Sequence, residues 1–162
     1  MEMKCVVVTP ERTALEQSAS LISVPLYDGA YGIALNHTPV VGRLGAGELR
    51  LKSADKTDVY YVSGGFVEVM DNVVSLLTSR AIPIAEITLQ RAEMALVEAK
   101  AKPHSTPEET ALRDAAINEA RAMLRIAKKI SFLLKFCRKS EKKRSVLLFF
   151  VYGRCVFRKR GR

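Results

Sequence analysis

Few side chains in this sequence of 162 residues have the types and spacing that chemistry requires. The two histidines, His37 and His104, lie far apart, and no Ser/His/Asp or Cys/His grouping and no acidic pair with metal-ligand spacing stands out. The glycine-rich stretch from Gly42 to Gly47 lacks the Lys-Ser/Thr of a phosphate-binding loop and the third glycine of a dinucleotide fingerprint. The sequence therefore predicts no catalytic residue, no metal site and no resident cofactor.

Composition predicts a folded domain. The chain is 48% hydrophobic and 27% charged, which is sufficient for a packed core. The longest apolar run is far shorter than the roughly 18 residues of a membrane-spanning helix, and no secretory signal is visible. Three scattered cysteines favour a reducing compartment over a disulfide framework.

The net charge of +9 belongs to the end of the chain. Residues 1–130 hold 15 Lys and Arg against 16 Asp and Glu, whereas residues 131–162 hold 11 Lys and Arg and one acid, Glu141. If any part of the chain neutralises the phosphates of a nucleic acid, it is therefore residues 131–162. No nucleic-acid partner is expected for the main body of the chain.

The first half of the chain is expected to form strands. Alternating apolar residues predict strands over 4–8, 19–26, 47–52, 58–63, 66–70 and 73–78. Asp71-Asn72 predicts a hairpin turn, and Gly64-Gly65 predicts a bulge between two strands. Pro25 restricts its strand to a sheet edge or places it near a strand end, and Gly29 and Gly32 predict a tightly turning loop around Tyr31.

A helical hairpin is expected after the strands, with helices at about 88–102 and 107–130. Thr106 as N-cap, Pro107 in the first turn and Glu109 three residues after the cap mark the second helix start. The helical stripes are rich in alanine, which buries little area, so we expect the hairpin to dock weakly. The predicted fold class is α+β: an antiparallel β-sandwich over residues 1–85, a two-helix antiparallel hairpin over 86–130, and a basic aromatic tail over 131–162.

Five short strings of residues follow one another along the chain, and as a set they are specific for one protein family. Together they resemble the epsilon subunit of the rotary proton-translocating ATP synthase over residues 3–130, while the tail after Ile130 has no counterpart there. The strings are Val8-Thr-Pro-Glu11, Val24-Pro-Leu-Tyr-Asp-Gly29, Gly32-Ile-Ala-Leu-Asn-His-Thr-Pro39, Val62-Ser-Gly-Gly-Phe-Val-Glu-Val69 and Ile87-Thr-Leu-Gln-Arg-Ala92.

The resemblance implies a non-catalytic rotor subunit in the central stalk, which couples proton flow to ATP synthesis. It implies that the sandwich binds the gamma subunit and the ring of c subunits. The hairpin either folds against the sandwich or extends toward the catalytic beta and alpha subunits, where it blocks ATP hydrolysis. It also implies a peripheral location at the cytoplasmic face of the inner membrane, within the complex.

Three groups of residues receive roles from the resemblance. Tyr31, Asn36 and His37 are expected to contact the c-ring, with a buried structural role as the alternative for His37. The second group is expected to meet an acidic segment of the beta subunits, and the alternative is that it forms a solvated helix face. Its members are Arg121, Arg125, Lys128 and Lys129.

The third group would bind regulatory ATP, the one cofactor that the resemblance suggests. Some relatives bind ATP through an Ile-Asp-x-x-Arg-Ala motif and arginines of the second helix. Ile87, Arg91 and Ala92 match this motif, whereas Thr88 replaces the aspartate; Thr can cap the helix but lacks the carboxylate. The arginines on the second helix would be Arg121 and Arg125.

A different class of function is the alternative. The β-sandwich would then be an adaptor module, and its basic tail, with five of the six phenylalanines of the chain, would bind an anionic membrane or nucleic acid. The third interpretation treats residues 131–162 as an extension without function.

Overall fold

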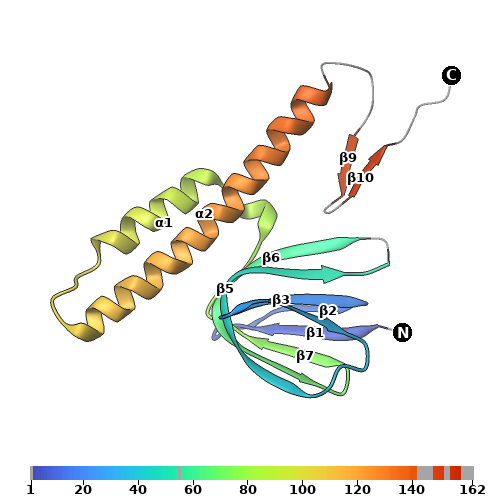
Figure 1. Ribbon diagram of the computed structural model, residues 1–162, viewed down its shortest axis with the longest axis horizontal. Coiled ribbons are helices and arrows are strands. Elements are labelled where there is room, and N and C mark those ends of the chain that lie inside the picture. The colour runs from blue at the N-terminus through green and yellow to red at the C-terminus, as the bar shows by residue number, and fades with distance from the viewer. Residues whose placement is uncertain (1, 55, 142–147, 152–153, 158–162) are drawn as a thin grey trace.

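The strands form one hydrogen-bonded sheet that curls into two facing layers (Figure 1). The computed structural model describes residues 2–54, 56–141, 148–151 and 154–157. Strand order is β2-β1-β7-β6-β5-β3-β4, with β8 also paired to β6. The bounds are Met3–Val8 (β1), Thr13–Ala19 (β2), Leu21–Leu26 (β3), Gly29–Ala34 (β4), Val40–Lys52 (β5), Thr57–Met70 (β6), Val73–Leu77 (β7) and Ala81–Pro83 (β8).

The space between the layers is filled by aliphatic side chains, which confirms the predicted β-sandwich. All pairings are antiparallel except that of β1 with β7. Side chains of alternate residues point inward, as the period of a strand requires. Fully buried members of this core include Cys5, Val7, Ile22, Val24, Ile33, Leu49, Leu51, Val62, Val74 and Leu76.

Three strands of the sandwich escaped the sequence analysis: β2 and β4, at the two ends of the sheet order, and the short β8, which pairs with β6. β2 is largely polar, and β4 contains two glycines in the segment that was predicted to be a loop. An edge strand has one neighbour and buries less, so its side chains show a weaker apolar alternation. Pro25 lies one residue before the end of β3, where pairing with β5 is interrupted between Ser23 and Leu26.

The predicted bulge at Gly64-Gly65 is wrong. β6 runs through both glycines without a change of register against β5. The glycines have φ of +81° and +125°, so the strand bends there instead of gaining a residue. In contrast, the predicted turn at Asp71-Asn72 is confirmed, with φ of +50° and +62° as a type I′ hairpin requires.

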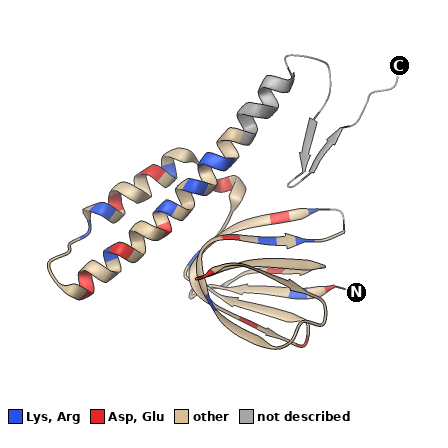
Figure 2. Ribbon diagram, viewed as in Figure 1, with Lys and Arg blue, Asp and Glu red and all other residues tan. Residues whose placement is uncertain are grey.

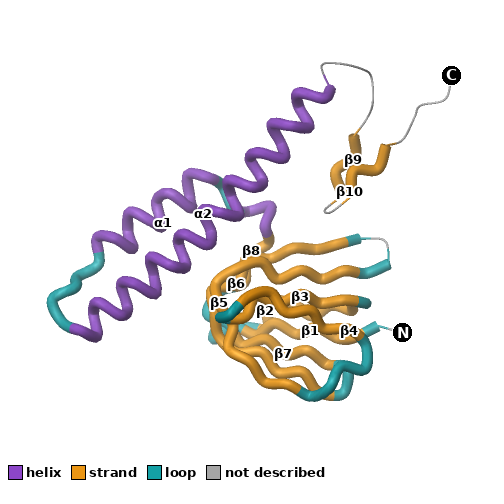
Figure 3. Tube along the Cα trace, in the orientation of Figure 1, coloured by secondary structure: helices purple, strands orange, loops and turns teal. Residues whose placement is uncertain are grey.

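The helices begin where their capping residues predict (Figure 3). A short 3₁₀ helix, Ile84–Glu86, leads to α1, Leu89–Ala101, whose N-cap Thr88 accepts a hydrogen bond from the Arg91 backbone N–H at 3.2 Å. At the start of α2, the Glu109 backbone N–H donates to Thr106 Oγ1, and the Thr106 N–H donates to Glu109 Oε2, each at 3.2 Å. This reciprocal pair is the predicted capping box.

The predicted end of the second helix at residue 130 is wrong. Helix α2 spans Pro107–Glu141 and continues into the segment that was assigned to the tail. The composition changes at residue 131, but residues 131–141 contain neither glycine nor proline, so nothing in the backbone ends the helix there. Further along, β9, Leu148–Val151, pairs antiparallel with β10, Arg154–Phe157. The rest of the predicted tail lies outside the described residues.

Two features are absent from the part of the chain that the structure describes. No helix in this part of the chain is long and apolar enough to cross a membrane. Across the same residues, no three His, Cys, Asp or Glu side chains gather as a metal site would require.

Candidate functional site

The hairpin docks on the sandwich through one face of α2. Met123 and Ile126 of this helix are buried against Tyr61 of β6 and against Ile84 and Ile87, which connect the sandwich to α1. Three of the five hairpin residues buried in this face are alanines, Ala92, Ala122 and Ala127, as expected, but the two large side chains of Met123 and Ile126 lie among them. Alanines dominate the separate contact between α1 and α2, whose buried members are Ala99, Ile117 and Ala120. Leu112 of α2 is exposed.

Two polar contacts accompany this apolar docking face. The buried Tyr61 hydroxyl donates a hydrogen bond to the carbonyl oxygen of Glu119 at 3.1 Å. Lys129 Nζ lies 3.2 Å from Glu48 Oε1 on β5, and Arg50 binds the same carboxylate. Burial alone would raise the pKa of Glu48, but the hydrogen bonds from Arg50 and Lys129 outweigh it and hold that pKa below its ordinary value.

Acid is expected to weaken docking through Glu48. Its depressed pKa means that the carboxylate stabilises the docked state above the ordinary Glu pKa of about 4.3, and that this contribution is lost as the pH falls through the lower folded value. A half-exposed ion pair contributes about 0.5–1 kcal/mol, so the ratio of docked to undocked chains should fall roughly two- to fivefold. Energy transfer between dyes on the sandwich and at the start of α2 measures this ratio.

The matched control separates Glu48 from its neighbours. Burial raises the pKa of Glu119, so this group gives docking a pH dependence opposite in sign to that of Glu48. The effect of Glu48 is therefore measured as the difference between the wild-type chain and Glu48→Gln. The variant should lack the acid-induced step. Glu16→Gln removes an ion pair with Lys4 on the sandwich and should retain the step. An identical step in wild type and Glu48→Gln would contradict the prediction.

The other cations predicted to act on α2 point to solvent. Arg121, Arg125 and Lys128 are exposed and form no ion pair within residues 2–54 and 56–132. Figure 2 shows that basic residues follow the part of α2 next to the sandwich, whereas acidic residues lie nearer to its start. The structure thus separates the predicted group: Lys129 belongs to the docking contact, and the other three are accessible to a partner.

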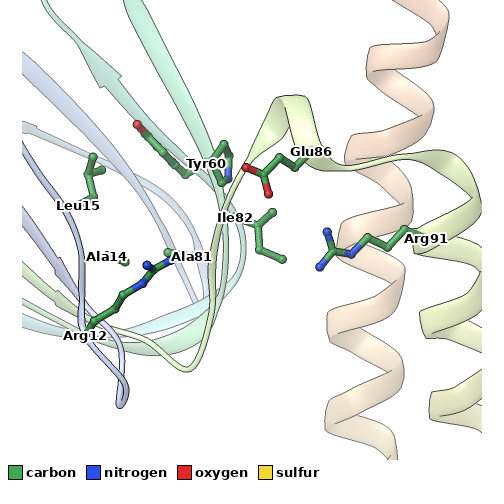
Figure 4. A pocket seen from close by; sticks show the side chains of 9 residues that line it. Arg12, Ala14, Leu15, Tyr60, Ala81, Ile82, Glu86 and Arg91 are labelled. Atoms are coloured by element: carbon green, nitrogen blue, oxygen red, sulfur yellow. The ribbon is translucent and has the colours of Figure 1, made fainter.

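The residues predicted to contact nucleotide do not all lie at one site. Ile87 and Ala92 are buried in the docking face and present no polar group. Arg91 lines a cavity of about 210 Å³ together with Arg12, Tyr60 and others, as Figure 4 shows. Arg121 and Arg125 do not line this cavity. ATP binding by the five residues together therefore stays a prediction.

Tyr31, Asn36 and His37 come together at the end of the sandwich. The Tyr31 hydroxyl lies 3.1 Å from His37 Nε2, and the two rings meet edge to face with centroids 5.5 Å apart. The Asn36 backbone N–H donates to Asn72 Oδ1 in the β6–β7 turn. That turn also accepts the Lys4 backbone N–H at 3.0 Å, which places it beside the N-terminus, away from the hairpin (Figure 1). Tyr31 and His37 are half-buried and Asn36 is exposed.

An apolar patch on the outer surface of β5, β6 and β7 was missed by the sequence analysis. Val41, Phe66 and Leu77 are each more than half exposed, and Phe66 and Leu77 are cross-strand partners. The Arg43 guanidinium, also opposite Phe66, lies 5.4 Å from the Tyr27 ring centre. The signal was present, because the strands over 66–70 and 73–77 carry apolar residues on both faces. Exposed apolar patches of this kind mark interaction sites.

The fold and these surfaces define a binding subunit: a β-sandwich with a docked helical hairpin, which offers contact surfaces at its turns, its outer face and its helix. The model of the ATP synthase delta/epsilon chain β-sandwich domain matches residues 2–84. The ATP synthase epsilon chain of Rhodopirellula baltica is 44% identical over 128 residues, which are 79% of this chain and 100% of the relative. The chain belongs to the ATP synthase delta/epsilon family.

Other relatives agree with this assignment. The sodium ion specific ATP synthase epsilon chain of Propionigenium modestum is 36% identical over 90 residues, 56% of this chain and 66% of the relative. A chain in the Euglena gracilis mitochondrial ATP synthase structure of OSCP, F1 and c-ring superposes with a TM-score of 0.64 at 25% identity, over 75% of this chain and 79% of that one. The predicted fold class and the function as a rotor subunit of ATP synthase are confirmed.

Proposed function

We propose that the chain is a non-catalytic rotor subunit whose two ends bind different parts of the ATP synthase, so that it links ion flow to ATP synthesis. The observation that carries this proposal is the separation of two surfaces. The Asn36 turn, next to the Tyr31–His37 cluster, is linked to the β6–β7 turn beside the N-terminus, and the hairpin leaves the sandwich away from that end (Figure 1). The solved structures with the same fold belong to assemblies of F1, central stalk and c-ring. Within this complex the chain is peripheral, on the cytoplasmic side.

The Tyr31–His37 cluster is the proposed contact with the c-ring. Its turn is exposed at the tip, while β4 fixes Tyr31 and the Tyr31 hydroxyl fixes the His37 ring. A rigid aromatic pair on a short turn loses little conformational entropy when it binds, which favours affinity. The apolar patch of Val41, Phe66 and Leu77 is a separate surface, and we assign it to the gamma subunit in the stalk.

A binding experiment tests the ring contact. His37→Ala removes the imidazole, and we expect the dissociation constant of the chain from an epsilon-depleted complex with its c-ring to rise about tenfold, as loss of about 1.4 kcal/mol at an interface residue predicts. Proton pumping per ATP hydrolysed should fall with it. His104→Ala is the matched control, since His104 is exposed in the turn between the helices. An affinity unchanged by His37→Ala would refute the assignment.

The hairpin is the proposed regulatory arm. Arg121, Arg125 and Lys128 are free to meet the acidic surface of the catalytic subunits when α2 leaves the sandwich, whereas Lys129 must first release Glu48. Charge complementarity would favour this association and orient it. In this state the hairpin would block ATP hydrolysis, so docking against the sandwich is the permissive state.

A further inference from the structure

Two turns at the proposed ring-contact end are joined by a pair of asparagine side chains. Asn72, in the β6–β7 turn, accepts the Asn36 backbone N–H on Oδ1 at 2.7 Å and donates from Nδ2 to Asn36 Oδ1 at 3.3 Å. The residues are 36 positions apart in the chain. The link therefore ties the β4–β5 connection, which carries His37, to a hairpin in the other part of the sheet.

Both partners have unusual backbone conformations. Asn36 has φ of +59° and Asn72 has φ of +62°, in the left-handed region, which is uncommon for residues other than glycine although asparagine enters it more readily than most. In the Asn36 turn, the support comes from few contacts: the His37 backbone N–H donates to the Ala34 carbonyl at 3.2 Å, and Asn72 holds the Asn36 N–H. Asn72 is itself fixed, because its carbonyl accepts the Lys4 N–H.

We propose that Asn72 is a positioning residue for the ring contact: by holding Asn36 in the left-handed conformation, it directs the His37 ring to Tyr31 and toward the c-ring. This inference rests on the proposed function of the Tyr31–His37 cluster. Asn72 acts through the turn, and its amide fits the role because it offers an acceptor and a donor at once.

The variant Asn72→Gly removes the amide and keeps the hairpin, because Asp-Gly is a favoured dipeptide in a type I′ turn. Without its acceptor, the Asn36 amide should exchange with solvent about five- to tenfold faster in NMR measurements, as loss of one hydrogen bond predicts. The dissociation constant from the epsilon-depleted complex should rise about threefold to tenfold. Asn72→Asp keeps an acceptor oxygen and should restore slow exchange and near wild-type affinity.

Ser53→Ala is the matched control. It removes another long-range loop contact, from Ser53 Oγ to the Ser18 carbonyl at 3.0 Å, and should alter neither the Asn36 exchange nor the affinity. Unchanged Asn36 exchange in Asn72→Gly overturns the positioning role, and so does faster exchange with unchanged affinity. If His37→Ala weakens binding while Asn72→Gly does not, this inference fails and the proposed function stands. If His37→Ala has no effect, the proposed ring contact fails.

Discussion

Replacement of Gly65 by alanine is expected to lower the free energy of unfolding by about 3–5 kcal/mol, one of the largest effects of a single methyl group in this chain. A Cβ atom at this position would lie 1.9 Å from the Leu77 carbonyl oxygen, which is too close for any real contact. In addition, φ is +125°, a conformation that side chains disfavour. Strand β6 would have to straighten or separate from β7, and the sheet would lose its bend.

Urea denaturation followed by circular dichroism measures this change. Gly32→Ala is the control, because a Cβ atom there meets nothing within 4 Å and its φ is ordinary for a strand. That variant should stay within about 1 kcal/mol of the wild-type chain. Domains of this size are stable by about 5–15 kcal/mol, so the Gly65→Ala protein should unfold at a much lower urea concentration. Equal stability of the two variants would contradict the clash.

The sequence predicted those parts of the fold that local chemistry determines. The capping box of Thr106 and Glu109 and the turn at Asp71-Asn72 depend on residues within four positions of each other, and both were found. β2 and β4 were missed because edge strands bury little. The bend at Gly64-Gly65 was misassigned because a bulge and a bend use the same residues, and only the register against β5 separates them.

The surfaces were predicted less completely, because they depend on tertiary contacts. Tyr31 and His37 were named from the resemblance, but their mutual contact depends on how the chain turns after β4, and the link from Asn36 to Asn72 joins segments that lie far apart in the chain. Lys129 was grouped with Arg121 and Arg125 from the resemblance, whereas Glu48 of β5 gives it a different partner. Spacing on a helix determines which residues share a face, and the opposing element determines what that face does.

The docking face of α2 yields the second large prediction. Met123 and Ile126 are buried in the docked state and would be exposed if the hairpin left the sandwich. Their replacement by alanine together should therefore penalise the docked state, at about 2 kcal/mol or more for each side chain. The contact between α1 and α2 involves different residues, Ala99, Ile117 and Ala120, so the hairpin itself should persist. The docked-to-undocked ratio should fall by about a thousandfold.

Energy transfer between dyes at positions 52 and 108 would report undocking, since Lys52 lies on β5 and Glu108 lies near the start of α2. Met94→Ala with Leu112→Ala is the matched control. These side chains are 63% and 69% exposed, so their loss should leave the energy transfer unchanged. If Met123→Ala with Ile126→Ala also left it unchanged, the docking face would not hold the hairpin.

In the assembled complex, the same double variant should hydrolyse ATP more slowly than the wild-type complex, because more hairpins are free to reach the catalytic subunits. Adding Arg121→Ala, Arg125→Ala and Lys128→Ala should restore hydrolysis, since these cations are exposed in the docked state and would carry the extended contact. Lys129 is left unchanged, because its ion pair with Glu48 belongs to docking. Added salt should weaken the inhibition, as screening acts over about 8–10 Å at ordinary ionic strength. Slow hydrolysis that persists after removal of the three cations would show that they are only a solvated helix face.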